Sequence, residues 1–145
     1  APNRGYYFDF MEFLKNHEKN MTPSTPSISH IFALQSKLEE IFSEGLDQRF
    51  ARHQRMAEIT RQWARERGFG LFPQPGCESV TLTCVANRRN VDVAAWIKRL
   101  RERHCCVIDG GYGKLKGATF RIAHMGNETP ESIAQLLKWL DDTME

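Results

Sequence analysis

Apolar residues recur at helical spacing in several stretches of the chain. From Ile28 to Phe42 an apolar side chain returns every three or four positions, which predicts an amphipathic helix. Thr25 suits the N-cap of this helix, and Pro26 suits its first turn, where a missing N–H costs nothing. A second long helix is expected from Leu46 to Arg67, with several arginines on its polar face.

Two shorter helices follow. One is expected to begin at Asn90 as its N-cap and to bury Ala94, Ala95, Ile97 and Leu100. The last helix has a clear start, since Thr129 suits the N-cap and Pro130 the first helical position. Its buried stripe would comprise Ile133, Leu136, Leu137 and Leu140.

Three runs have the composition of strands: Val80 to Val85, Cys105 to Ile108, and Thr119 to Ala123. From residue 46 the expected order is therefore helix, strand, helix, strand, strand, helix. A small α/β (α+β) sheet covered by helices on one face is the simplest arrangement that buries all the apolar stripes.

The first 26 residues differ from the rest. They are aromatic-rich up to Leu14, then polar, and then turn-forming at residues 21–26. This segment has aromatic side chains to bury but little periodic structure with which to bury them. We expect it to pack against something outside this chain, which would leave Tyr6, Tyr7, Phe8 and Phe10 poorly covered.

Composition narrows the class of protein. The 145 residues are 41% hydrophobic and 26% charged, which is ordinary for a globular domain of this length. A net charge of +2 is too small to favour nucleic acid or an anionic membrane as a partner. No apolar run approaches the roughly 20 residues of a membrane span, and the start lacks a signal-peptide pattern, so a cytoplasmic location is expected.

The four cysteines do not form a metal site by spacing. Cys77, Cys84, Cys105 and Cys106 contain no C-x-x-C pair, and no matching histidine pair follows. We interpret them as small apolar residues in a reducing compartment.

Three ordered stretches carry a resemblance to a known family. They are residues 22–34 (TPSTPSISHIFAL), residues 44–53 (EGLDQRFARH) and residues 110–126 (GGYGKLKGATFRIAHMG), with residues 6–9 (YYFD) upstream. Together they resemble the C-terminal portion of class V pyridoxal-phosphate-dependent aminotransferases, of the alanine/serine–glyoxylate and aminoethylphosphonate group.

The resemblance implies a dimeric enzyme of fold type I that transfers an amino group between an amino acid or amine and a 2-oxo acid. Residues 1–26 would be the end of the large domain and its active-site turn, residues 27–45 a linking helix, and residues 46–145 the C-terminal small domain with a three- to four-stranded sheet. The lysine that binds pyridoxal 5'-phosphate lies upstream in such enzymes, and Lys114 and Lys116 do not match its place. The chain alone is therefore expected to be inactive.

The resemblance also suggests site residues. Arg121 would bind the substrate α-carboxylate, because a guanidinium donates two parallel charge-assisted hydrogen bonds to such a group; the alternative is a solvent-facing strand arginine. Thr25, with Thr22 and Ser24 as companions, would approach the cofactor phosphate of the neighbouring subunit. The alternative for Thr25 is a plain N-cap.

Two other features leave alternatives open. The glycine-rich stretch 110–117 fails the spacing of a phosphate-binding loop, because Leu115 follows Lys114 and no helix begins there. It is either the rim of the active site or a connector. His124 either hydrogen-bonds within the site or has a structural or exposed role.

Other functions are also compatible with this sequence. A free-standing α/β binding or dimerisation module would use the same small sheet. A cysteine desulfurase of the same class would need an exposed nucleophilic cysteine near the cofactor, which the spacing does not favour. Nucleic-acid binding through the arginine-bearing helix disagrees with the near-neutral charge.

Overall fold

The computed structural model describes residue 5 and residues 7–144. The chain divides into two compact units, Ala1–Glu44 and Gly45–Glu145. The first unit contains helices α1 (Phe10–His17) and α2 (Ile28–Glu44). Within the described residues, no helix is both long and apolar enough to cross a membrane.

Helix α1 was not expected from the sequence. Asp9 caps it by accepting a hydrogen bond from the Met11 backbone N–H at 3.0 Å. Tyr7, Phe8 and Phe10 are exposed, which confirms their predicted lack of cover. Tyr6, which shared that prediction, lies outside the described residues.

Helix α2 begins later than predicted, so the assignment of Thr25 as its N-cap is wrong. The Ile28 N–H donates to the Pro26 carbonyl at 3.0 Å in a tight turn, and the first helical bond runs from the Ile31 N–H to the Ser27 carbonyl at 3.1 Å. Ser27 therefore precedes the helix, and its hydroxyl lies 2.6 Å from Nδ1 of His30. No residue of α2 is buried within the chain.

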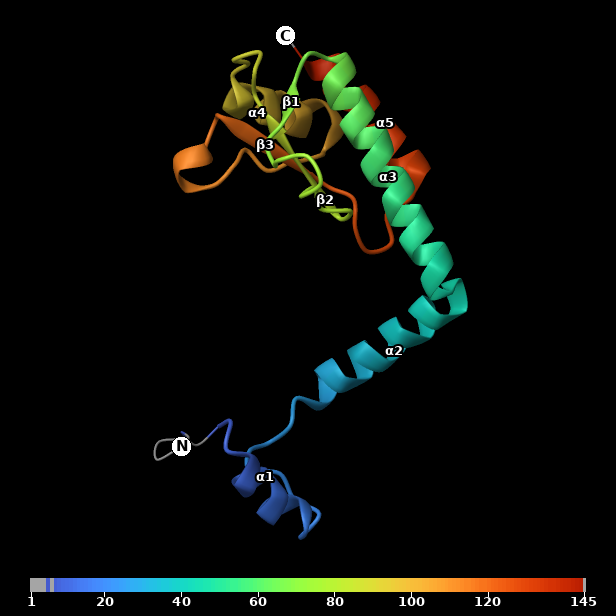
Figure 1. Cartoon of the computed structure of the whole chain (residues 1–145), viewed down its shortest axis with the longest axis vertical. Helices are drawn as coiled ribbons and strands as arrows, with labels where there is room; N and C mark the ends of the chain where they lie inside the picture. Colours follow the sequence, from blue (N-terminus) through green and yellow to red (C-terminus); the bar gives the residue numbers. More distant parts are fainter. Residues whose placement is uncertain (1–4, 6, 145) are drawn as a thin grey trace. The chain divides into compact units, whose positions relative to one another are not determined.

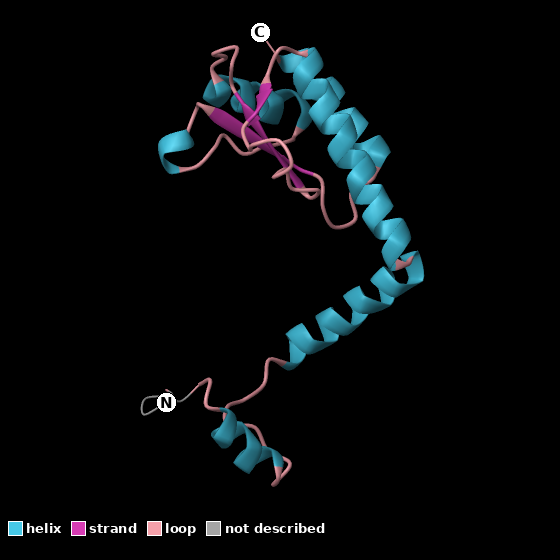
Figure 2. Ribbon diagram, viewed as in Figure 1, coloured by secondary structure: helices cyan, strands magenta, loops and turns pink. Residues whose placement is uncertain are grey.

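The second unit contains a three-stranded sheet and three long helices, whose arrangement Figures 1 and 2 show. Its elements in chain order are α3 (Leu46–Glu66), β1 (Gly70–Leu71), β2 (Leu82–Ala86), α4 (Val93–His104), a 3₁₀ turn η1 (Gly113–Leu115), β3 (Thr119–Ala123) and α5 (Pro130–Thr143). The sheet is antiparallel in the order β1-β2-β3, and Leu82 pairs with Ala123 at one end of the β2–β3 ladder.

The core lies between one face of the sheet and the helices. Val85, Phe120 and Ile122 point from β2 and β3 into it, and helices α3, α4 and α5 supply the other side. An aromatic cluster fills its centre, with Trp63, Phe69, Trp96 and Phe120 in mutual ring contact. The expected mixed α/β domain, with helices on one face of a small sheet, is confirmed.

The structure corrects two predicted elements. Cys105–Ile108 is not a strand: Cys105 ends α4 in the left-handed conformation at φ 51°, and an isolated bridge to Arg121 forms only at the following residue, Asp109. Asn90 does not cap α4, because it lies in a turn at φ 53°. Asp92 is the cap, and its carboxylate accepts from the Ala95 N–H at 3.0 Å.

The remaining helix boundaries follow the sequence closely. The helix predicted over residues 46–67 is α3, and the predicted start of α5 is confirmed by a reciprocal capping box between Thr129 and Ser132. Strand β1 was missed, because a pair of residues beginning with a glycine carries no strand pattern.

Candidate functional site

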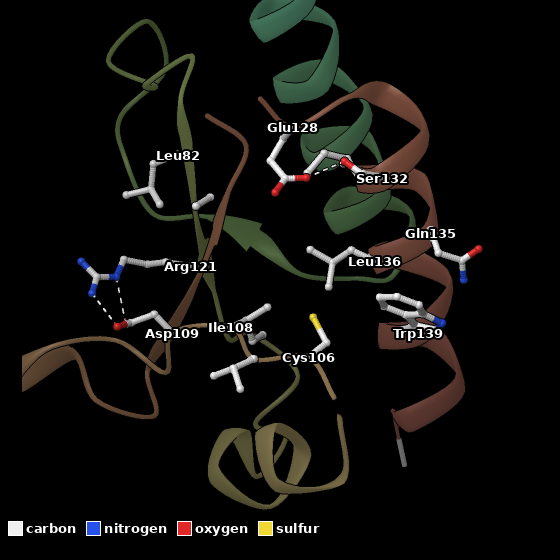
Figure 3. A pocket seen from close by; sticks show the side chains of 13 residues that line it. Leu82, Cys106, Ile108, Asp109, Arg121, Glu128, Ser132, Gln135, Leu136 and Trp139 are labelled. Atoms are coloured by element: carbon white, nitrogen blue, oxygen red, sulfur yellow. Dashed lines mark hydrogen bonds and ion pairs between the residues drawn. The ribbon is translucent and has the colours of Figure 1, made fainter. Parts of the chain in front are cut away.

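A pocket of about 780 Å³ lies at the β3 edge of the sheet (Figure 3). Residues from β2, β3, the segment 106–109 and α5 surround it. Its lining comprises Leu82, Cys106, Val107, Ile108, Asp109, Arg121, Ala123, Glu128, Ser132, Ile133, Gln135, Leu136 and Trp139. An apolar wall with a few charged groups is typical of a small-molecule site.

The alternation of β3 places Arg121 at this pocket. Phe120 and Ile122 are fully buried in the core, so the residue between them points to the opposite face of the sheet. The Arg121 side chain retains 34% of its exposure there. The prediction that Arg121 lies in an apolar strand is confirmed, and Arg121 lines the pocket.

Asp109 pairs with Arg121 through both backbone and side chain. The Arg121 N–H donates to the Asp109 carbonyl at 2.8 Å, and the Asp109 N–H donates back at 3.3 Å. Arg121 Nε donates to Asp109 Oδ1 at 2.9 Å, and a terminal guanidinium nitrogen lies 2.8 Å from Oδ2. Figure 3 shows this two-pronged contact, which is the geometry expected between arginine and a carboxylate.

The pair fixes the charge state of both groups. The hydrogen bond from Arg121 lowers the pKa of Asp109, and the hydrogen bond to Asp109 raises the pKa of Arg121. Asp109 was missed from the sequence. The sequence feature that could have indicated it is an acidic residue directly before Gly110 and Gly111, where the glycine-rich stretch that precedes the Arg121 strand begins.

The glycine-rich stretch orients the Asp109 side chain through a backbone hydrogen bond. The Gly111 N–H donates to Asp109 Oδ1 at 2.9 Å. Gly111 has φ +86°, and a Cβ there would lie 2.5 Å from the Leu115 carbonyl oxygen. Only glycine fits this position, so the donor that orients the aspartate depends on it.

A second charged group lines the pocket from the turn before α5. The Glu128 carboxylate accepts a hydrogen bond from the Ser132 hydroxyl at 2.5 Å. Two arginines of α3 hold the same turn, because Arg49 and Arg52 donate to the Gly126 carbonyl at 3.2 and 3.1 Å. Part of the arginine-bearing face of α3 is therefore structural.

His124 is buried away from the pocket lining. Its Nε2 lies 2.8 Å from the Thr83 hydroxyl, and its side chain is fully covered. Burial lowers the pKa of His124, so the imidazole is neutral at physiological pH. A structural role, one of the two alternatives for this residue, is the one that its position supports.

The predicted phosphate-binding residues lie in the first unit. Thr22, Ser24 and Thr25 are all exposed. The Thr22 hydroxyl donates to the Ser24 carbonyl at 2.7 Å, which folds these residues into a turn just before α2.

Two cysteines and two lysines with reactive side chains can be placed in the structure. Burial raises the pKa of Cys84 and of Cys106, which keeps both thiols protonated. Lys114 and Lys116 are exposed in and beside η1. Across the described residues, no group of three or more His, Cys, Asp or Glu side chains could hold a metal ion.

Known proteins that resemble this chain are mainly aminotransferases. No family model matches the chain. An uncharacterised aminotransferase of Methanocaldococcus jannaschii is 34% identical over 84% of this chain and 32% of its own length. The small subunit of a soluble hydrogenase from Synechococcus is 34% identical over 83% and 31%, and the serine–glyoxylate aminotransferase of Arabidopsis thaliana is 32% identical over 83% and 31%.

Solved structures agree. An alanine–glyoxylate aminotransferase from Nostoc superposes with a TM-score of 0.82 at 30% identity, over 96% of this chain and 37% of that protein. The chain thus spans about a third of the length of the relatives that it matches. The matching part is their C-terminal portion, and the fold is that of fold-type I aminotransferases. The chain is therefore a homologue of the C-terminal portion of the class V aminotransferases.

Proposed function

We propose that this chain is the small-domain portion of a pyridoxal-phosphate-dependent aminotransferase that exchanges an amino group between an amino acid or amine and a 2-oxo acid. Its described residues would supply the carboxylate-binding side of the site. The rest of the polypeptide, equivalent to the other two-thirds of the relatives, would supply the cofactor-binding lysine and the large domain. The intact enzyme would be a homodimer.

The position of Arg121 carries this proposal. An amino acid donor and a 2-oxo acid acceptor both present a carboxylate, and Arg121 offers a guanidinium at the rim of a pocket large enough for a small acid. The contact with Asp109 supports this role, because the guanidinium there pairs with both oxygens of a carboxylate. Holding the carboxylate fixes the direction of the neighbouring C–H bond, and this positioning is the contribution of Arg121 to the reaction.

The turn before α2 fits the proposed cofactor phosphate by its chemistry. Thr22, Ser24 and Thr25 bear exposed hydroxyls, which are hydrogen-bond donors of the kind that phosphate oxygens accept. We propose that Thr25, with Thr22 and Ser24, holds the phosphate of the neighbouring subunit's cofactor. The bound cofactor would supply the electron sink that the amino transfer needs.

This chain alone is expected to have no transaminase activity, because no lysine in it is assigned to the cofactor. The test is incubation of the 145-residue chain with pyridoxal phosphate, followed by borohydride and peptide mapping. We expect no stable absorbance band that borohydride fixes on one lysine. Such a band on Lys114 or Lys116 would contradict this part of the proposal.

Carboxylate binding tests the role of Arg121 directly. The chain, labelled with ¹⁵N, is titrated with sodium acetate at constant ionic strength, and the Nε–Hε resonance of Arg121 is followed by NMR. We expect acetate to shift this resonance saturably. Acetate binding is also followed by the chemical shift of the Gly111 amide. In Arg121→Gln the Nε–Hε resonance is absent, and we expect the Gly111 amide no longer to respond to acetate. Acetate binding that persists unchanged at Gly111 in Arg121→Gln would overturn the proposal.

A further inference from the structure

We propose that Asp109 is an internal competitor that occupies Arg121 until a substrate carboxylate displaces it. The inference rests on the proposed carboxylate-binding role of Arg121. It assigns to the Asp109 carboxylate the position on Arg121 that a ligand carboxylate would take.

The first support is chemical identity. Asp109 presents to Arg121 the same group that an amino acid or a 2-oxo acid would present, with contacts of 2.9 and 2.8 Å. A second carboxylate at the same edge of the guanidinium would meet both a filled set of donors and a like charge. A ligand must therefore displace Asp109 or bind next to its negative charge, and either event weakens the binding of anions.

The second support is that the side-chain pair is not the only link between its two segments. The backbone bonds between Asp109 and Arg121 already join their segments. Another two-pronged pair in the same unit, Arg67 with Asp141, makes a useful contrast: it links α3 to α5, and the Trp63 indole N–H also donates to that aspartate at 2.9 Å. The Arg67 pair is a tertiary link between helices, whereas the Arg121 pair lines a pocket.

The third support is that the competitor is displaceable. The Asp109 side chain keeps 50% of its exposure and the Arg121 side chain 34%, so water screens the attraction between them. Exposed ion pairs of this kind change an equilibrium by at most about fivefold. The Gly111 N–H remains available to Asp109 as a second anchor, so the aspartate has a resting position when it releases the arginine.

The test is the acetate titration described above, carried out at pH 7 on four versions of the full chain. Asp109→Asn removes the charge and keeps an oxygen that can accept from Gly111. Asp109→Ser serves as a second, shorter replacement in case the amide disturbs the turn. Glu102→Gln is the matched control, because it removes one negative charge from an exposed pair with Lys98 on α4.

We expect Asp109→Asn and Asp109→Ser to bind acetate about threefold to fivefold more tightly than the unmodified chain, and Glu102→Gln to differ by less than about twofold. Equal or weaker binding in both Asp109 variants would overturn the inference. If Arg121→Gln abolishes acetate binding but the Asp109 variants bind acetate as the unmodified chain does, the inference fails and the proposed role of Arg121 stands. If no version binds acetate through Arg121, the proposed function of Arg121 fails as well.

Discussion

Replacement of Phe120 by alanine removes the side chain at the centre of the aromatic cluster. Phe120 is fully buried, and its ring centroid lies 5.1 Å from that of Phe69, 5.2 Å from Trp96 and 6.5 Å from Trp63, each in an edge-to-face arrangement. Large-to-small changes of phenylalanine in a core cost about 3–5 kcal/mol. The rigid rings around Phe120 cannot easily collapse into the space, so we expect the free energy of unfolding to fall by about 4 kcal/mol.

Phe120→Leu separates volume from aromatic contact. Leucine fills most of the space and forfeits the edge-to-face contacts, so the expected loss is about 1–2 kcal/mol. Phe50→Ala is the control, because Phe50 on α3 is 64% exposed and its truncation should cost less than about 0.5 kcal/mol.

Urea unfolding followed by tryptophan fluorescence measures these losses. The three tryptophans, Trp63, Trp96 and Trp139, all lie in the Gly45–Glu145 unit, so the signal reports that unit within the full chain. If Phe120→Ala lowers the free energy of unfolding by less than about 1 kcal/mol, the cluster does not hold β3 in place. The account of how Arg121 is positioned between two core residues would then be wrong.

Two further predictions concern the neighbours of β3. Because burial lowers the pKa of His124 in the folded state, the unfolded chain takes up a proton first as pH falls through about 6.5, and stability should decline from pH 7 to pH 5. His124→Gln should flatten that decline in urea midpoints, and an unchanged slope would contradict it. Gly111→Ala should destabilise the unit by about 2 kcal/mol or more, since φ is +86° and a Cβ would lie 2.5 Å from the Leu115 carbonyl oxygen. Gly113→Ala, at φ +54° in open space, should cost about 1 kcal/mol, and equal losses at the two glycines would refute the steric argument.

The elements that could be predicted from sequence are those with a local physical signature. Helix α5 has a cap, a proline and an apolar stripe that all agree, and β3 has an alternating pattern that buries Phe120 and Ile122. The run Cys105–Ile108 shows where composition fails. It has the residues of a strand, but Cys105 is needed in the left-handed conformation to end α4, and that local geometry turns the chain before a ladder can form.

Of the two paired residues in the candidate site, only Arg121 could be nominated from the sequence. Arg121 follows from its place in an apolar strand and from the family resemblance, whereas Asp109 depends on a pairing between segments 12 residues apart in the chain. That pairing is a tertiary contact, which neither propensity nor periodicity encodes. The prediction of Thr25 as the N-cap of α2 was wrong for a more local reason, because the chain makes a tight turn at Pro26 before the helix begins.

The two sets of proposed binding residues, at Arg121 and at Thr25, should differ in how far they form in this chain. Arg121 lies between two fully buried residues of a unit that has its own core, so its guanidinium is held without help from other polypeptide. Thr25 lies in the other unit, where no residue of helix α2 is buried. Even Phe32 and Phe42 of this helix are 65% and 67% exposed. We propose that phosphate binding at the turn before this helix needs α2 to be covered by the large domain or a second subunit. Carboxylate binding at Arg121 should therefore survive in the isolated chain, whereas phosphate binding at Thr25 should not. An inorganic phosphate titration that shifts the Thr25 amide as strongly as acetate shifts Arg121 would contradict this division.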